Sequence, residues 1–357
     1  MKHIFLVKSP LQLLNAIEAK HHYQLQADDC YLLVMADRKS FPQLIQQVEA
    51  SGEWLHVVPI YRVPLWFSDP WRELDETDDL LQQRDTLLRS SFFNIRRLNR
   101  LARHGGEVGY VFIGDNNNIY MRHFAHVVSH RQSVLLDDGT STLDIACQRL
   151  QGVRQRKPAR ISKRLKRLAK RWLQGLRDEQ PEQVEFFTVY NIEVSASDRR
   201  VKNDFRFLRR HAQTLKQSDD VYFLGSPLSE VGLMDEEEYL CQLGRVRAHW
   251  PDAAMVYVAH RRESVEKLKQ IETQLSMAVR LFDFPIEYQI AVLGPRPRQI
   301  ISFFTSALDN LHQILGEDIH ISACRLPAGS YREPERIDPI YRHYEQIANA
   351  HFQLLEI

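Results

Sequence analysis

Ile4-Phe-Leu-Val-Lys-Ser-Pro-Leu-Gln-Leu-Leu-Asn-Ala-Ile-Glu-Ala-Lys20 is the stretch of sequence that indicates the fold class. It opens with an apolar run, residues 4–7, that has the length of a buried strand. Ser9 is a favoured N-cap residue, and Pro10 suits the first helical position because an N–H there has no helical partner. A strand that leads directly into a capped helix is typical of a parallel sheet with crossover helices.

The same alternation of short apolar runs and longer segments of helical period continues through the first 140 residues. Residues 1–150 are therefore predicted to form one Rossmann-like α/β domain. We expect its further strands at 31–35, 55–60, 110–113 and 134–136, and its further helices at 41–51, 80–103 and 116–130.

The α/β alternation resumes later in the chain and predicts a second Rossmann-like domain over residues 216–335. Residues 151–215 are expected to be a basic segment and linker, and residues 336–357 a terminal segment whose helix, 339–355, packs back across both halves. In the second domain we expect strands at 221–224, 255–259, 299–304 and 319–325, and helices at 236–247, 264–275 and 307–315.

The composition is that of a globular protein with a sizeable core, because 44% of the 357 residues are hydrophobic. Disorder, a fibre and a disulfide-stapled miniprotein are excluded. The formal net charge of +1 gives no overall electrostatic case for nucleic acid. The cysteines, Cys30, Cys147, Cys241 and Cys324, form no C-x-x-C pair, which suits a reducing compartment, and we interpret them as small core residues.

The amino terminus has an apolar run too short for a signal peptide, since Lys8 follows Val7. No stretch approaches the roughly 18 apolar residues of a membrane-spanning helix. We therefore expect a cytoplasmic protein whose membrane contact, if any, is peripheral.

Positive charge is concentrated in residues 154–177, which hold eleven Lys or Arg residues and no acid. One interpretation is an amphipathic helix on an anionic inner-membrane surface; the alternatives are a solvated helix or linker, or an RNA-binding segment. Trp172 is the only aromatic residue here and no RNA-binding motif accompanies it, so nucleic acid is disfavoured. The apolar stripe consists of Ile161, Leu165, Leu168, Trp172, Leu173 and Leu176.

Asp137-Asp138-Gly139 directly follows an apolar strand, where parallel sheets bind ligands. A carboxylate there can act as a general base on a hydroxyl. The alternative is an ordinary strand-ending turn, because Asp and Gly both favour turns.

Val256-Tyr-Val-Ala-His-Arg-Arg-Glu263 repeats this arrangement in the second half. The imidazole of His260 can donate to a phosphate oxygen or supply a proton. Its alternative is a surface turn in which Arg261 and Arg262 are solvated.

A third candidate is Ser302-Phe-Phe-Thr-Ser-Ala-Leu-Asp-Asn-Leu311, which indicates a strand that ends at Thr305-Ser306 and opens a helix. Hydroxyls and free N–H groups at a helix N-terminus can bind phosphate, although simple capping is commoner. Glu287, in a preceding loop, can hold the hydroxyls of a ribose.

Several catalytic motifs are absent from the sequence: P-loop, G-x-G-x-x-G, H-E-x-x-H and G-x-S-x-G. No D-x-D is present to clamp a metal on a nucleotide diphosphate. We therefore expect a phosphate site without metal and without a resident cofactor.

The collinear order of these motifs resembles that of bacterial lipooligosaccharide sialyltransferases and the related capsular polysialyltransferases. The resemblance implies the glycosyltransferase-B (GT-B) fold, with two facing Rossmann-like domains. The matching residues are Ser9-Pro-Leu-Gln-Leu-Leu-Asn-Ala-Ile-Glu18, Asp137-Asp138-Gly139, Leu224-Gly-Ser-Pro-Leu-Ser-Glu230, Glu236-Glu-Glu-Tyr239, His260, Pro285-Ile-Glu287, Ser302 and Thr305-Ser306-Ala-Leu308.

The resemblance also implies roles for these residues. Asp137 would be the general base, with Asp138 as its neighbour, and His260 would contact or protonate the leaving CMP phosphate. Arg261 stands where these families usually have proline, which leaves the donor sugar open. The remaining donor-binding residues would be Gly139, Glu287 on the ribose, and Ser302, Thr305 and Ser306 on the phosphate.

The function implied is inverting transfer of sialic acid from CMP-sialic acid to a hydroxyl of a surface glycan or glycolipid, lipooligosaccharide or capsule. The alternatives are transfer of another CMP-activated nonulosonate or Kdo, and a non-enzymatic nucleic-acid-binding or scaffold protein. A donor carboxylate would also need a partner, for which Lys8 or the helix terminus at Ser9 is a candidate.

Overall fold

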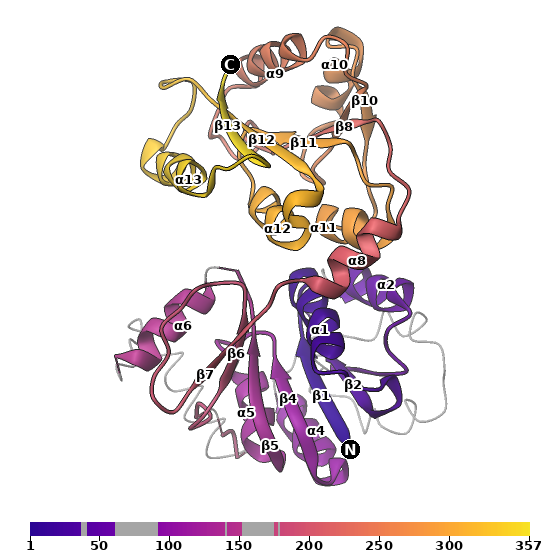
Figure 1. Ribbon diagram of the computed structural model, residues 1–357, viewed down its shortest axis with the longest axis vertical. Helices are drawn as coiled ribbons and strands as arrows, with labels where there is room; N and C mark the ends of the chain where they lie inside the picture. Colours follow the sequence, from indigo (N-terminus) through magenta and orange to yellow (C-terminus); the bar gives the residue numbers. More distant parts are fainter. Residues whose placement is uncertain (37–40, 61–91, 140, 152–174, 178) are drawn as a thin grey trace. The chain divides into compact units, whose positions relative to one another are not determined.

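The computed structural model describes residues 1–36, 41–60, 92–139, 141–151, 175–177 and 179–357. The chain divides into two compact units, Met1–Asn203 and Asp204–Ile357. Most of the basic segment, residues 154–174, lies outside the described residues. Figure 1 shows that each unit is a sheet flanked by helices.

The sheet of the first unit contains seven parallel strands in the order β3-β2-β1-β4-β5-β6-β7. The strand order reverses between β1 and β4, and ligands of open parallel sheets bind at such a reversal, beyond the carboxyl ends of the strands. The strands are β1 (Lys2–Val7), β2 (Cys30–Val34), β3 (His56–Pro59), β4 (Val108–Ile113), β5 (His130–Leu136), β6 (Glu185–Thr188) and β7 (Arg199–Lys202).

Helices of the first unit cover an apolar sheet whose adjacent residues face opposite sides. Leu6 packs in a core cluster with Leu98 and Phe124, whereas Phe5 stacks on Phe112 with ring centroids 4.1 Å apart. Ser9 caps the first helix as predicted. The helices are α1 (Pro10–His22), α2 (Phe41–Ser51), α4 (Phe92–Gly105), α5 (Ile119–Val127) and α6 (Ser141–Leu150).

The sheet of the second unit contains six parallel strands in the order β10-β9-β8-β11-β12-β13, with the reversal between β8 and β11. The strands are β8 (Val221–Leu224), β9 (Met255–Val258), β10 (Ala278–Arg280), β11 (Gln299–Ser302), β12 (His320–Arg325) and β13 (Phe352–Glu356). The helices are α8 (Arg206–Thr214), α9 (Glu236–His249), α10 (Val265–Gln274), α11 (Ile286–Tyr288), α12 (Ser306–Leu315) and α13 (Pro334–Ile347).

Two parallel Rossmann-like sheets confirm the predicted α/β class. The first unit extends beyond residue 150, because β6 and β7 add to its sheet. The sequence analysis predicted neither β6 nor β7. Strand β7 lies at the sheet edge, and its Arg199, Arg200 and Lys202 leave no apolar run. How the two domains face each other, as the GT-B fold requires, stays a prediction.

The expectation of a terminal helix to residue 355 is wrong for its last part. Helix α13 ends at Ile347, and Phe352–Glu356 forms β13 beside β12. Asn349 causes the break, because its Oδ1 accepts the backbone N–H groups of His351 and Phe352 at 2.7 and 2.9 Å. The crossing of this segment over both halves stays a prediction.

The interpretation of all cysteines as core residues is half wrong. Cys30 and Cys324 are buried, but Cys147 and Cys241 are exposed on helices. Among the described residues, no helix has the length and apolar character to span a membrane.

Candidate functional site

Asp137 lies directly beyond the carboxyl end of β5 in the first unit and is only 4% exposed. Its Oδ2 accepts the Val189 N–H at 2.8 Å, while its buried Oδ1 has no hydrogen-bond partner among the described residues. Burial raises the pKa of Asp137 to about 6, outweighing the opposing Thr188 hydroxyl and Val189 N–H. This carboxyl group can therefore gain and lose a proton near neutral pH.

Asp138 is the more exposed member of the acidic pair. Its Oδ1 accepts from Gln12 Nε2 of α1 at 2.8 Å, and its backbone N–H donates to Thr142 Oγ1 at 3.1 Å. Burial raises the pKa of Asp138 as well, against the Gln12 amide. Gly139 follows in a left-handed conformation, φ 62°, that the turn into α6 requires.

Further polar side chains join the same edge from the neighbouring strands. After β1, the Lys8 N–H donates to Gln12 Oε1 at 2.9 Å, and the Lys8 ammonium pairs with Asp115, which follows β4. Lys8 is thus already engaged by a carboxylate. Between β4 and Asp115 only glycine fits, because a Cβ on Gly114 would lie 2.7 Å from both the Leu6 carbonyl oxygen and Gln12 Oε1.

Asn15 of α1 connects Asp137, the first residue of the acidic pair, to Asn203. Its Nδ2 donates to the Asp137 carbonyl at 3.1 Å, and its Oδ1 accepts from Asn203, beyond β7, at 2.9 Å. Sequence analysis missed Gln12, Asn15 and Asn203. For Gln12 and Asn15 the available signal was a polar side chain among the apolar residues of α1.

We predict that Asp137→Asn raises the melting temperature at pH 7.5. A folded-state pKa of about 6 against the ordinary 3.8 means that the wild type loses stability as pH rises from about 4 through about 6. This loss of folding stability is on the order of 2–3 kcal/mol, and the asparagine variant does not suffer it because an amide does not ionise. Thermal melts should show a variant several degrees more stable at pH 7.5 and nearly equal to the wild type at pH 4. Equal melting temperatures at both pH values would contradict the raised pKa.

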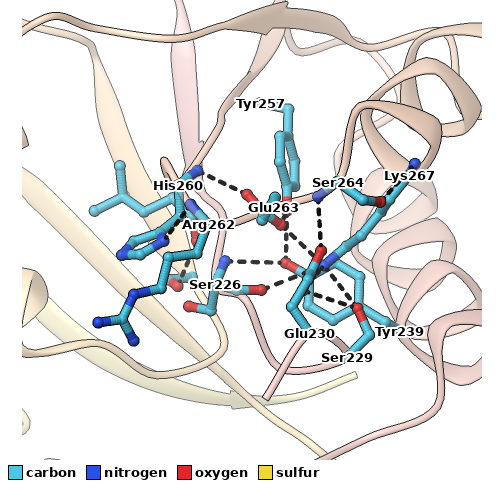
Figure 2. A network of polar contacts seen from close by, with 12 residues as sticks. Ser226, Ser229, Glu230, Tyr239, Tyr257, His260, Arg262, Glu263, Ser264 and Lys267 are labelled. Atoms are coloured by element: carbon cyan, nitrogen blue, oxygen red, sulfur yellow. Dashed lines mark hydrogen bonds and ion pairs between the residues drawn. The ribbon is translucent and has the colours of Figure 1, made fainter. Parts of the chain in front are cut away.

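His260 lies at the corresponding edge of the second unit, just beyond β9, and is half-buried (Figure 2). Its backbone N–H donates to Glu263 Oε2 at 2.7 Å, and its Nδ1 accepts the Arg262 N–H at 3.2 Å. Because Nδ1 is an acceptor, the neutral ring carries its hydrogen on Nε2. Burial, then Arg261 and Arg262, lower the pKa of His260, so near pH 7 it is a neutral hydrogen-bond donor.

The hydroxyl residues predicted to bind phosphate are placed differently from one another. Ser302 is fully buried, and its hydroxyl donates to the Leu224 carbonyl at 2.7 Å, so it is used inside the sheet. Thr305 caps α12 by accepting the Ala307 N–H at 3.4 Å. Ser306 is exposed as the first residue of α12.

Glu287 lies on α11, and its Oε1 accepts from Asn310 of α12 at 2.9 Å. The carboxylate is therefore oriented by the same helix that begins at Ser306. Among the described residues, no group of His, Cys, Asp or Glu side chains is arranged to hold a metal ion.

No family model matches the sequence. A search of curated proteins also finds no match. The solved structures similar to this chain include MurG from Acinetobacter baumannii, 10% identical, with a TM-score of 0.42 over 100% of this chain and 86% of that one.

Two further similar structures have different activities. E. coli heptosyltransferase WaaC, bound to ADP-2-deoxy-2-fluoro heptose, is 11% identical, with a TM-score of 0.43 over 98% of this chain and 100% of that one. UDP-GlcNAc 2-epimerase from Methanocaldococcus jannaschii is 9% identical, with a TM-score of 0.47 over 100% and 89%.

Ser226 is a residue of the second edge to which sequence analysis assigned no role. Its hydroxyl donates to the Phe304 carbonyl at 3.3 Å, and its N–H donates to Tyr239 Oη at 3.3 Å. It thus connects the loop after β8 with the loop leading to Thr305. The available signal was Gly225-Ser226-Pro227 directly after a strand, and a Cβ on Gly225 would lie 2.5 Å from Tyr257 Oη.

Proposed function

We propose that this chain is an inverting glycosyltransferase that moves sialic acid, or a closely related nonulosonate, from its CMP-activated form to a hydroxyl of a bacterial surface glycan. The observation that carries the proposal is Asp137, a carboxylate at the carboxyl edge of a parallel sheet. One of its oxygens accepts the Val189 N–H, and the other has no hydrogen-bond partner within the described part of the chain. Its pKa of about 6 suits a general base.

In this proposal Asp137 removes the proton of the acceptor hydroxyl as that oxygen attacks the anomeric carbon. The bond from the anomeric carbon to the CMP phosphate breaks at the same time, so the configuration inverts. The Val189 N–H holds one carboxylate oxygen, which leaves Oδ1 for the proton. Asp138, held by Gln12, is the neighbouring charge and the alternative base.

The second unit would bind the CMP part of the donor. His260 offers its Nε2–H to the phosphate, and the N-terminus of α12 at Ser306 adds backbone N–H groups and a favourable dipole. Glu287, already oriented by Asn310, is suited to the ribose hydroxyls. These interactions stabilise the charge that develops on the phosphate as it leaves.

Acceptor-free hydrolysis of a panel of nucleotide sugars tests this function. We expect cleavage of CMP-sialic acid or another CMP-nonulosonate, CMP-Kdo included, with UDP- and ADP-sugars inert. Selective cleavage of a UDP- or ADP-sugar would replace the CMP assignment. If no nucleotide sugar is cleaved, either with or without a glycan acceptor, the result would favour a non-enzymatic binding protein.

We further predict that turnover is retained in excess EDTA. A single leaving phosphate carries less charge than a diphosphate, and the sequence contains no D-x-D clamp. The rate in EDTA should therefore stay close to the rate measured without it. A loss of activity that magnesium or manganese specifically restores would refute this.

A further inference from the structure

Lys267 on α10 is a fully buried lysine to which the proposed reaction gives no task. Its Nζ lies 2.9 Å from Glu263 Oε1 and 3.4 Å from Glu230 Oε2. It also donates to the Ser226 carbonyl and to Ser229 Oγ, each at 3.3 Å. Figure 2 shows the ammonium at the centre of this group of polar side chains.

These contacts join two loops that come from adjacent strands. Ser226, Ser229 and Glu230 belong to the loop after β8, and Glu263 belongs to the loop after β9. A further bond between the loops runs from the Ser264 N–H to Glu230 Oε1 at 3.0 Å. One buried cation therefore holds both loops at the carboxyl edge of the second sheet.

Glu263 connects Lys267 to His260, because it accepts hydrogen bonds from both residues. Its Oε2 accepts the His260 N–H at 2.7 Å, and its Oε1 accepts from Tyr257 Oη at 2.5 Å as well as from Lys267. Tyr257 Oη in turn lies 2.7 Å from Tyr239 Oη, whose ring centroid is 3.7 Å from the Lys267 ammonium. A single hydrogen bond thus joins the backbone of His260 to the buried Lys267–Glu263 ion pair.

Stability alone does not account for such a cluster. The side chains of Lys267 and Glu263 are both 0% exposed, and removing two charges from water costs about as much as their attraction returns. Apolar side chains of the same volume would serve a core equally well. A fixed ion pair differs from an apolar contact in having directional bonds, which set the relative positions of the loops.

We propose that Lys267 is a positioning residue that clamps the loop after β8 to the loop after β9 and thereby fixes His260 relative to Ser226. The inference rests on the proposed function only in assigning a phosphate as the ligand of these loops. The clamp itself is a property of the second unit.

Amide hydrogen exchange tests the clamp without any ligand. The informative variant is Lys267→Met/Glu263→Gln, which leaves no unpaired buried charge and keeps an acceptor for the His260 N–H. We expect it to melt within a few degrees of the wild type while residues 225–230 and 259–264 exchange at least tenfold faster. Lys269→Met, an exposed lysine on the same helix, is the matched control and should exchange like the wild type.

Two exchange results would overturn the clamp: wild-type protection of both loops in the double variant, or faster exchange throughout the chain with a lower melting temperature. The second result would mean that Lys267 only stabilises the fold.

CMP affinity, measured by calorimetry, tests whether Lys267 acts through His260. The double variant should bind CMP at least tenfold more weakly than the wild type. In a His260→Ala background, the same double substitution should weaken CMP binding less than about twofold, because the residue through which it acts is already gone. Equal losses in the two backgrounds would overturn the positioning of His260. If the wild type binds no CMP, the proposed function fails, and the exchange result still decides the clamp.

Discussion

Asp137→Asn should lower kcat by roughly 100-fold or more while the affinity for CMP stays nearly unchanged. Asparagine keeps the size of the side chain and can still accept the Val189 N–H, but its amide cannot take a proton. The loss should therefore fall on the chemical step alone. Steady-state kinetics and CMP titration of the same preparation measure both quantities.

The kcat of this variant separates catalysis from a structural turn. If Asp137-Asp138-Gly139 were only a turn, the asparagine variant would show near-normal kcat. The higher melting temperature at pH 7.5 follows from the buried carboxyl group in either case, so it reports the raised pKa and confirms that the variant folds. Wild-type transfer by Asp137→Asn would move the assignment to Asp138, and an equally active Asp138→Asn would remove the proposed catalytic site.

His260→Ala should weaken CMP binding roughly 10- to 100-fold and reduce turnover, because a hydrogen bond to a charged phosphate is lost. His260→Gln should recover most of the affinity, since its amide N–H can replace the Nε2–H. The proposal assigns His260 a hydrogen-bonding role rather than proton donation, because burial and the neighbouring Arg261 and Arg262 lower its pKa.

The comparison of the two substitutions is decisive for the role of the ring. A glutamine variant as weak as the alanine variant in CMP binding would contradict the hydrogen-bonding role. A variant with restored affinity but without turnover would instead assign proton transfer to His260.

The strand and helix pattern of both domains was predictable because buried parallel strands form short apolar runs. Residues 221–224 and the Ser9 cap are examples in which local sequence decides the local structure. Strands β6, β7, β10 and β13 were not predicted. Strands β7, β10 and β13 lie at sheet edges, where one side of the strand is unpaired and hydrophobic patterning is weak. Strand β6 is buried, but its four residues lie in the stretch assigned to the linker.

The candidate site was predictable only where a strand leads directly into its polar residues. Asp137, Asp138 and His260 meet this condition, and all lie at a carboxyl edge. Gln12 and Asn15 do not, because their partners Asp138 and Asn203 are 126 and 188 residues away in the chain.

Ser302 illustrates a different difficulty. The resemblance implies that it binds phosphate, but it is the last residue of β11, and its hydroxyl donates to the Leu224 carbonyl. Sequence alone does not give the direction of a side chain at a strand end.

A crystal structure of the protein with CMP tests the central claim most directly, namely that the second unit is the nucleotide-binding domain of a CMP-sugar transferase. We predict the phosphate within hydrogen-bonding distance of His260 Nε2 and the Ser306 N–H, with the ribose hydroxyls on Glu287. CMP bound on the first unit, or a phosphate remote from both His260 and Ser306, would contradict the account.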